Sequence, residues 1–122
     1  MRKGSTRLRV LFDKNGPYGT RHFLSQHQVE TLDNHGWARI TNGELLKTAE
    51  AAGFEVMVTA DQNIVYQQSL QGRKIALVVL GSNIWPIVRN YEPAIRARVA
   101  TAVPGSYAFI EMQLPPRRPF SR

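Results

Sequence analysis

The run Ile75-Ala-Leu-Val-Val-Leu80 is the feature of this sequence that most restricts its fold. It is uninterrupted by polar residues, contains several β-branched side chains and ends at Gly81, which is typical of a short buried strand. A strand with no polar positions is buried on both faces, as happens when helices cover both sides of a parallel sheet. We therefore predict a strand over Lys74–Leu80 inside an α/β domain.

Other segments of the chain alternate between strand-like and helix-like patterns. Further strands are predicted over Arg7–Phe12, His27–Thr31, Phe54–Thr59 and Tyr107–Glu111. Helices are predicted over Tyr18–Leu24, Gly43–Ala52 and Ile64–Leu70, and over two segments that carry Pro86 and Pro93 in their first turns. Asp33–Trp37 is predicted to be a loop, because turn-forming residues dominate it. The alternation favours an α/β fold with a mostly parallel central sheet.

The length and charge distribution define the expected domain organisation. A chain of 122 residues has room for one core, and we expect a single domain over residues 9–112. Its formal charge of +7 is concentrated at the ends, since the basic residues of the body are balanced by acidic ones. We expect residues 1–8 to form a basic extension and residues 113–122 a mobile tail rich in proline and arginine. These ends could bind nucleic acid or only aid solubility.

Composition excludes several classes of protein and site. The sequence has no cysteine, which rules out disulfides, thiolate metal ligands and a thiol nucleophile. No apolar stretch follows the first residues as in a secretory signal, and the longest apolar run is too short to cross a bilayer. We expect a cytoplasmic protein that does not insert into a membrane.

Three carboxylates are expected near one edge of the sheet. Asp13 directly follows the first predicted strand, Asp61 follows the third, and Glu44 lies in the first turn of the helix before that strand. Ligands of parallel sheets bind beyond the carboxyl ends of the strands. Carboxylates gathered there repel one another unless a cation neutralises them, and Mg²⁺ or Mn²⁺ prefers such oxygen ligands. Such a metal could promote cleavage of a phosphodiester.

Each of the three acids also has a local alternative role. Asp61 could cap the following helix, Glu44 could interact with the N-terminus of its own helix, and Asp13 could stabilise a turn. These roles require no metal, and the sequence leaves both interpretations open.

The residues around these acids resemble a known family. The resemblance to prokaryotic PIN-like proteins, compact relatives of PIN-domain nucleases, covers residues 9–110 and is carried by Val10–Asn15, Asn42–Leu46, Val58–Asn63 and Ile75–Leu80. It implies a three-layer α/β/α sandwich and Mg²⁺- or Mn²⁺-dependent cleavage of RNA. It also implies a role as the toxin of a toxin–antitoxin pair, with an antitoxin protein as partner.

The resemblance implies roles for individual residues. Carried over by position, Asp13, Glu44 and Asp61 would be metal ligands and catalytic residues, and Asn63 would hold a catalytic water. PIN nucleases commonly place a further acid after a later strand, where this sequence has the neutral residues Ser82 and Asn83. This departure favours one metal over two.

Alternatives from other classes remain. A catalytically degenerate PIN-like module could bind RNA or an antitoxin without cleaving RNA. A haloacid-dehalogenase-type phosphatase would need a second aspartate after Asp13, and a phospho-accepting receiver domain would need an acidic pair there; the sequence has neither. The RNA target and the formation of a homodimer are left open.

Some other residues receive smaller predictions. Trp37 could stack on an RNA base, although a packing role is favoured. Lys47, Arg73 and Lys74 could bind phosphates near the site or lie on a solvated surface. His22, His27 and His35 lack the spacing of metal ligands.

Overall fold

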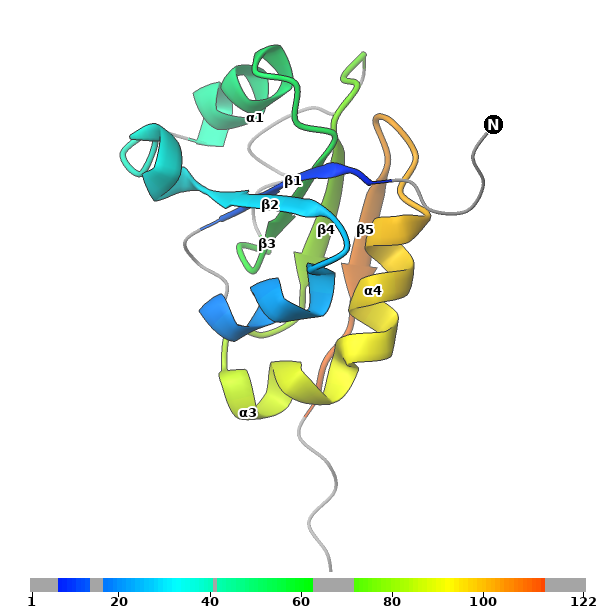
Figure 1. The fold of residues 1–122 in the computed structure, drawn as a ribbon. Helices are drawn as coiled ribbons and strands as arrows, with labels where there is room; N and C mark the ends of the chain where they lie inside the picture. Colours follow the sequence, from blue (N-terminus) through cyan, green and yellow to red (C-terminus); the bar gives the residue numbers. More distant parts are fainter. Residues whose placement is uncertain (1–6, 14–16, 41, 63–71, 114–122) are drawn as a thin grey trace, which may run out of the picture.

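The computed structural model describes residues 7–13, 17–40, 42–62 and 72–113 of the chain. Within them, one sheet contains five strands in the order β2-β1-β3-β4-β5, and every neighbouring pair is parallel (Figure 1). The strands are β1 (Arg9–Phe12), β2 (Gln28–Thr31), β3 (Val56–Thr59), β4 (Ala76–Leu80) and β5 (Tyr107–Ile110). The predicted α/β class with a parallel sheet is confirmed.

Helical segments connect the strands. They are the 3₁₀ helices η1 (Tyr18–Leu24), η2 (Leu32–His35) and η3 (Arg89–Tyr91), and the α-helices α1 (Asn42–Ala51), α3 (Trp85–Val88) and α4 (Glu92–Ala100). Pro86 and Pro93 lie in the first turns of α3 and α4, as predicted, where a missing backbone N–H costs no helical hydrogen bond. The helix predicted over Ile64–Leu70 lies outside the described residues. None of the helices described here is both long and apolar enough to span a bilayer.

The prediction of a loop over Asp33–Trp37 was wrong for its first half, where η2 forms. The Thr31 hydroxyl accepts a hydrogen bond from the Asn34 backbone N–H, and the Asn34 side chain accepts one from the Thr31 N–H. This reciprocal capping box stabilises the start of the turn. Gly36 ends it at a φ of 72°, a conformation that glycine adopts without a Cβ penalty.

Alternate residues of the inner strands pack against helices on opposite faces of the sheet. The core on one face contains residues of η1, α3 and α4 together with Val10, Phe12, Val58 and Val78. The core on the other face contains residues of η2 and α1 together with Leu11, Met57, Leu77 and Val79. The unbroken apolar character of β4 is therefore explained by burial on both faces.

A glycine marks the carboxyl end of β4. A Cβ on Gly81 would lie 2.7 Å from the carbonyl oxygen of Ile110 and 2.8 Å from the backbone nitrogen of Met112. The Gly81 N–H donates to that same Ile110 oxygen over 2.9 Å. Glycine is needed here because the chain leaves the sheet in close contact with the backbone that follows β5.

Candidate functional site

The strand order reverses between β1 and β3. From β1 the chain goes to β2 on one side of it, and then to β3 on its other side. In doubly wound sheets of this kind, the crevice beyond the carboxyl ends of the two strands at such a reversal is the usual ligand site. Asp13 follows β1 and Asp61 lies two positions after β3, so the topology puts both predicted acids at this switch point.

The Asp13 carboxylate is buried and held by a residue of β3. Asp13 is only 3% exposed, and its backbone N–H donates to the carbonyl oxygen of Val58 over 2.8 Å. The hydroxyl of fully buried Thr59 donates to Oδ2 of Asp13 over 2.6 Å. A hydrogen bond from a hydroxyl to a carboxylate at this length belongs to the strong, charge-assisted class. Thr59 thus sets the orientation of the Asp13 carboxyl group.

The same hydroxyl also contacts the loop that carries Asp61. The Asp61 backbone N–H donates to Oγ1 of Thr59 over 3.0 Å. Thr59 therefore joins the Asp13 side chain to the Asp61 backbone through one oxygen atom. We did not identify Thr59 from the sequence; the available signal was a polar residue ending an otherwise apolar strand.

The loops after β3 and β4 meet at this edge. The Gln62 side-chain amide donates to the carbonyl oxygen of Gly81 over 3.1 Å. Ser82, one of the two neutral residues at the place of a further acid, accepts the Ile84 N–H on its hydroxyl oxygen over 3.0 Å. Ser82 therefore has a local role in shaping the turn into α3.

Glu44 is placed differently from the two aspartates. It lies in the first turn of α1, where a negative charge interacts favourably with the helix N-terminus, and its side chain is exposed. In the described residues, no group of three or more His, Asp or Glu side chains is arranged to hold a metal ion. Thr59 links the Asp13 side chain to the Asp61 backbone, whereas the Glu44 side chain is exposed at the start of α1. Asn63 and the helix that Asp61 could cap lie outside the described residues.

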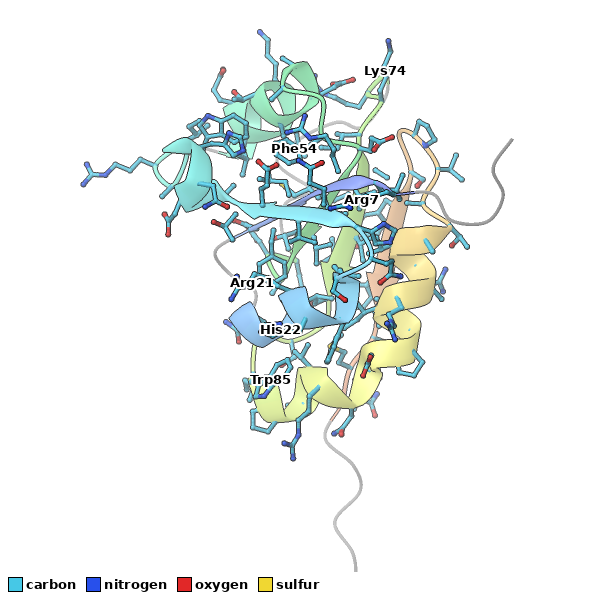
Figure 2. The ribbon with its side chains drawn as sticks, in the orientation of Figure 1. Arg7, Arg21, His22, Phe54, Lys74 and Trp85 are labelled. Carbon is cyan, nitrogen blue, oxygen red and sulfur yellow. The ribbon has the colours of Figure 1, made fainter. Side chains whose placement is uncertain are left out.

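Two of the basic residues considered for phosphate binding lie away from the switch point. Arg73 pairs with Glu50 over 2.9 Å, and the Lys74 backbone N–H donates to the same carboxylate over 2.6 Å. The hydrogen bond from Lys74, followed by that from Arg73, lowers the pKa of Glu50. Because both basic residues precede β4, they lie at the amino edge of the sheet, and Figure 2 shows Lys74 there.

Basic side chains also come from the connection between β1 and β2. Arg21 and His22 belong to η1, and Figure 2 shows both on the same side of the molecule as Trp85 at the start of α3. The Trp85 and Phe23 rings are 5.6 Å apart between centroids, so η1 and α3 pack together. Along the chain, η1 follows β1 and α3 follows β4, so both helices come after the carboxyl end of a strand.

Trp37 has the packing role. Its ring stacks on His35 at 4.4 Å between centroids and meets the edge of Phe54 at 6.0 Å. The guanidinium of Arg9 lies 4.3 Å from the centre of the Phe54 ring. His35 contacts the carboxylate of Glu30 over 2.5 Å, and this hydrogen bond is the main cause of the lowered pKa of Glu30. The cluster joins η2 to the sheet.

Comparisons of the chain with protein-family models, with curated proteins and with solved structures gave no match in any of the three.

Proposed function

We propose that this protein is a cytoplasmic, metal-dependent ribonuclease of the PIN-like type, acting as the toxin of a toxin–antitoxin pair. Its site would be the crevice beyond β1 and β3. The observation that supports this most is the Thr59 hydroxyl, which orients the buried Asp13 carboxylate and contacts the Asp61 loop at the topological switch point. Asp13 is a buried carboxylate at the place where a doubly wound sheet usually binds its ligand.

The chemistry of these residues fits Mg²⁺ or Mn²⁺. The side chains of Asp13, Asp61 and Thr59 offer only hard oxygen atoms. Mg²⁺ is often held by one or two carboxylates together with waters and substrate phosphates, so Asp13 and Asp61 could hold it without a third acid. In that case Glu44 would not need to bind the ion directly. A bound ion would lower the pKa of an attacking water and offset negative charge on the phosphodiester.

The remaining roles belong to the protein's own side chains. Because Thr59 occupies Oδ2 of Asp13, the carboxyl group cannot rotate freely, and its other oxygen has a defined direction. Arg21 and His22 of η1 would contact the phosphates of RNA and hold the RNA strand across the crevice. Arg73 would not contribute, since it is paired with Glu50 at the opposite edge.

A second candidate is the degenerate PIN-like module, which would bind RNA or an antitoxin without cleavage. It is favoured by the neutral residues Ser82 and Asn83 and by the lack of a three-acid group in the part of the chain that is described. The two candidates differ in whether a metal binds at Asp13 and Asp61.

Asp61→Asn tests the proposal, because it keeps the shape of the side chain and an oxygen that can cap a helix while removing one charge. For the wild type we expect stabilisation by Mn²⁺ in a thermal melt, amounting to about 2.7 kcal/mol at a concentration 100-fold above Kd. We also expect Mn²⁺-dependent cleavage of RNA. Asp61→Asn should lose both the stabilisation by Mn²⁺ and the cleavage of RNA. Asp33→Asn, which changes an exposed acid of η2, is the matched control and should keep both.

Equal cleavage by wild type and Asp61→Asn would refute the assignment of Asp61. If Mn²⁺ neither stabilises the wild type nor supports cleavage, the degenerate module is the correct interpretation.

A further inference from the structure

Among the described residues, no strand pairs with the outer side of β5, which leaves its backbone edge open. Strand β5 ends the sheet at the side remote from β2 and pairs with β4 (Figure 1). The N–H groups of Leu77 and Gly81 donate to the carbonyl oxygens of Ser106 and Ile110, each over 2.9 Å. Because backbone groups alternate along a strand, those of Tyr107 and Phe109 point the opposite way, towards the open edge.

The two aromatic side chains of this strand are exposed. Tyr107 is 43% and Phe109 is 40% exposed. They lie in register with Leu77 and Val79, so both belong to the sheet face opposite α4. Ala108 and Ile110 lie on the α4 face. An edge strand without a charge or a proline is an unprotected pairing surface.

The other edge of the sheet is different. There, β2 carries the polar residues Gln28 and Glu30, whose side chains are hydrogen-bonded to each other over 2.9 Å. Charged and polar side chains are a usual protection of edge strands against pairing. The contrast singles out β5 as the edge suited to a partner.

We propose that β5 pairs antiparallel with β5 of a second copy of this chain, with the two-fold axis passing at Ala108. This arrangement joins the two sheets into one continuous sheet. Two-fold dimers of this kind use the same surface of both subunits.

The order of residues in β5 suits such self-pairing. A two-fold axis at Ala108 brings Tyr107 of one copy opposite Phe109 of the other, and the reverse. These are the residues whose N–H and C=O groups point outwards, so each opposite pair can exchange two hydrogen bonds. Both aromatic pairs lie on the same face, and aromatic cross-strand pairs stabilise antiparallel strands.

The small side chain at the axis also fits. Ala108 would face its own copy in a non-hydrogen-bonded pair, where Cα atoms approach to about 4.5 Å. Ala108 lies on the face of the sheet that α4 covers, in register with Val78. The formal charge of +7 on each copy opposes association. Pairing through β5 adds little to this repulsion, because the strand itself carries no charged side chain.

The dimer leaves the candidate site accessible. β3 and β4 separate β5 from β1, so the switch point is far from the paired edge. A variant can therefore lose the dimer and keep nuclease activity, or lose nuclease activity and keep the dimer.

Molar mass in solution tests the proposal. We expect light scattering on the full chain to give twice the 13.8 kDa of one copy. Phe109→Lys should give the mass of a monomer, because it introduces two charges into the paired edge. Ile84→Lys is the control: Ile84 is a 54% exposed apolar residue in the turn before α3, and this variant should stay dimeric. Circular dichroism of each variant checks that it is folded.

Cross-linking tests the register, because the natural chain has no cysteine. In Ala108→Cys, the two introduced thiols would face each other at a Cα separation within the disulfide range of about 4.4–6.8 Å. We expect oxidation to give a covalent dimer. Tyr107→Cys should not, since its thiol would lie opposite Phe109 of the other copy. A monomeric wild type without cross-linking, or equal cross-linking of both variants, would overturn the proposal.

Discussion

The hydroxyl of Thr59 donates a hydrogen bond to Oδ2 of Asp13 over 2.6 Å, although 46 positions separate the two residues in the sequence. Both residues are buried where β1 and β3 end side by side. A carboxylate in such a place needs a donor, because an unpaired buried charge is costly. The Thr59 hydroxyl is such a donor, and its bond to Oδ2 also fixes the direction of the Asp13 carboxyl group.

Replacement of Thr59 should show what this bond contributes. Thr59→Val keeps the branched shape but removes the hydrogen bond from the hydroxyl to buried Asp13, and we expect it to lower the free energy of unfolding by about 1–3 kcal/mol. Thr59→Ser keeps the hydroxyl and should lower the free energy of unfolding by less. Urea unfolding of both variants measures the difference. Equal stability of the two variants would show that the hydroxyl has no net effect on folding.

The pH dependence of stability should reveal the buried His27. Its Nδ1 accepts the Leu8 backbone N–H over 3.1 Å. Burial lowers the pKa of His27 from 6.5, the positive charge of Arg7 lowers it further, and Glu55 opposes this. As the pH falls below about 6.5, the unfolded chain binds a proton that the folded protein resists, so the free energy of unfolding should decrease. Above that pH, His27 should contribute no pH dependence.

Urea unfolding at about pH 7.5 and about pH 5.5 measures this decrease, in a range above the titration of Glu30 and Glu50. His27→Asn should weaken the pH dependence, because its amide oxygen can accept the Leu8 N–H but does not titrate. His22→Asn changes an exposed histidine and should keep the wild-type decrease. An unchanged slope in His27→Asn would assign the effect to another group.

The contact between Gly19 and Trp85 should be sensitive to one added methyl group. A Cβ on Gly19 would lie 2.8 Å from Cη2 of the Trp85 ring. Gly19→Ala must therefore displace the ring or the helix η1, and we expect a loss of stability of about 1–3 kcal/mol. Thermal melts and tryptophan fluorescence measure both effects.

A double variant distinguishes this clash from a backbone effect. In a Trp85→Leu background, the added methyl group has more space, so Gly19→Ala should cost less than in the wild type. An equal cost in both backgrounds would place the effect in the backbone of η1.

Local features were predicted well when they depended on near neighbours in the chain. β4 was recognisable because its apolar run has no polar interruption, and α3 and α4 because Pro86 and Pro93 suit only a first turn. The position of Tyr18–Leu24 was also correct, but the apolar spacing did not distinguish a 3₁₀ helix from an α-helix. The turn η2 was missed, because its stability depends on the reciprocal bonds between Thr31 and Asn34.

The candidate site was predicted in part. Parallel topology alone puts residues that follow strands at one edge, which is why Asp13 and Asp61 could be selected from the sequence. The sequence did not indicate that Arg73 would pair with Glu50, nor that the Glu44 side chain would be exposed at the start of α1.

The sequence by itself determined the order of the strands, the burial of β4 and the acids that follow β1 and β3, because these depend on periodicity and on the residues next to them. Only the tertiary structure decided that β1 lies between β2 and β3, and therefore that Thr59 reaches Asp13. It also decided that β5 is an outer strand with Tyr107 and Phe109 exposed. The physical reason is that strand neighbours are chosen by the packing of whole faces across the sheet, which no local pattern encodes.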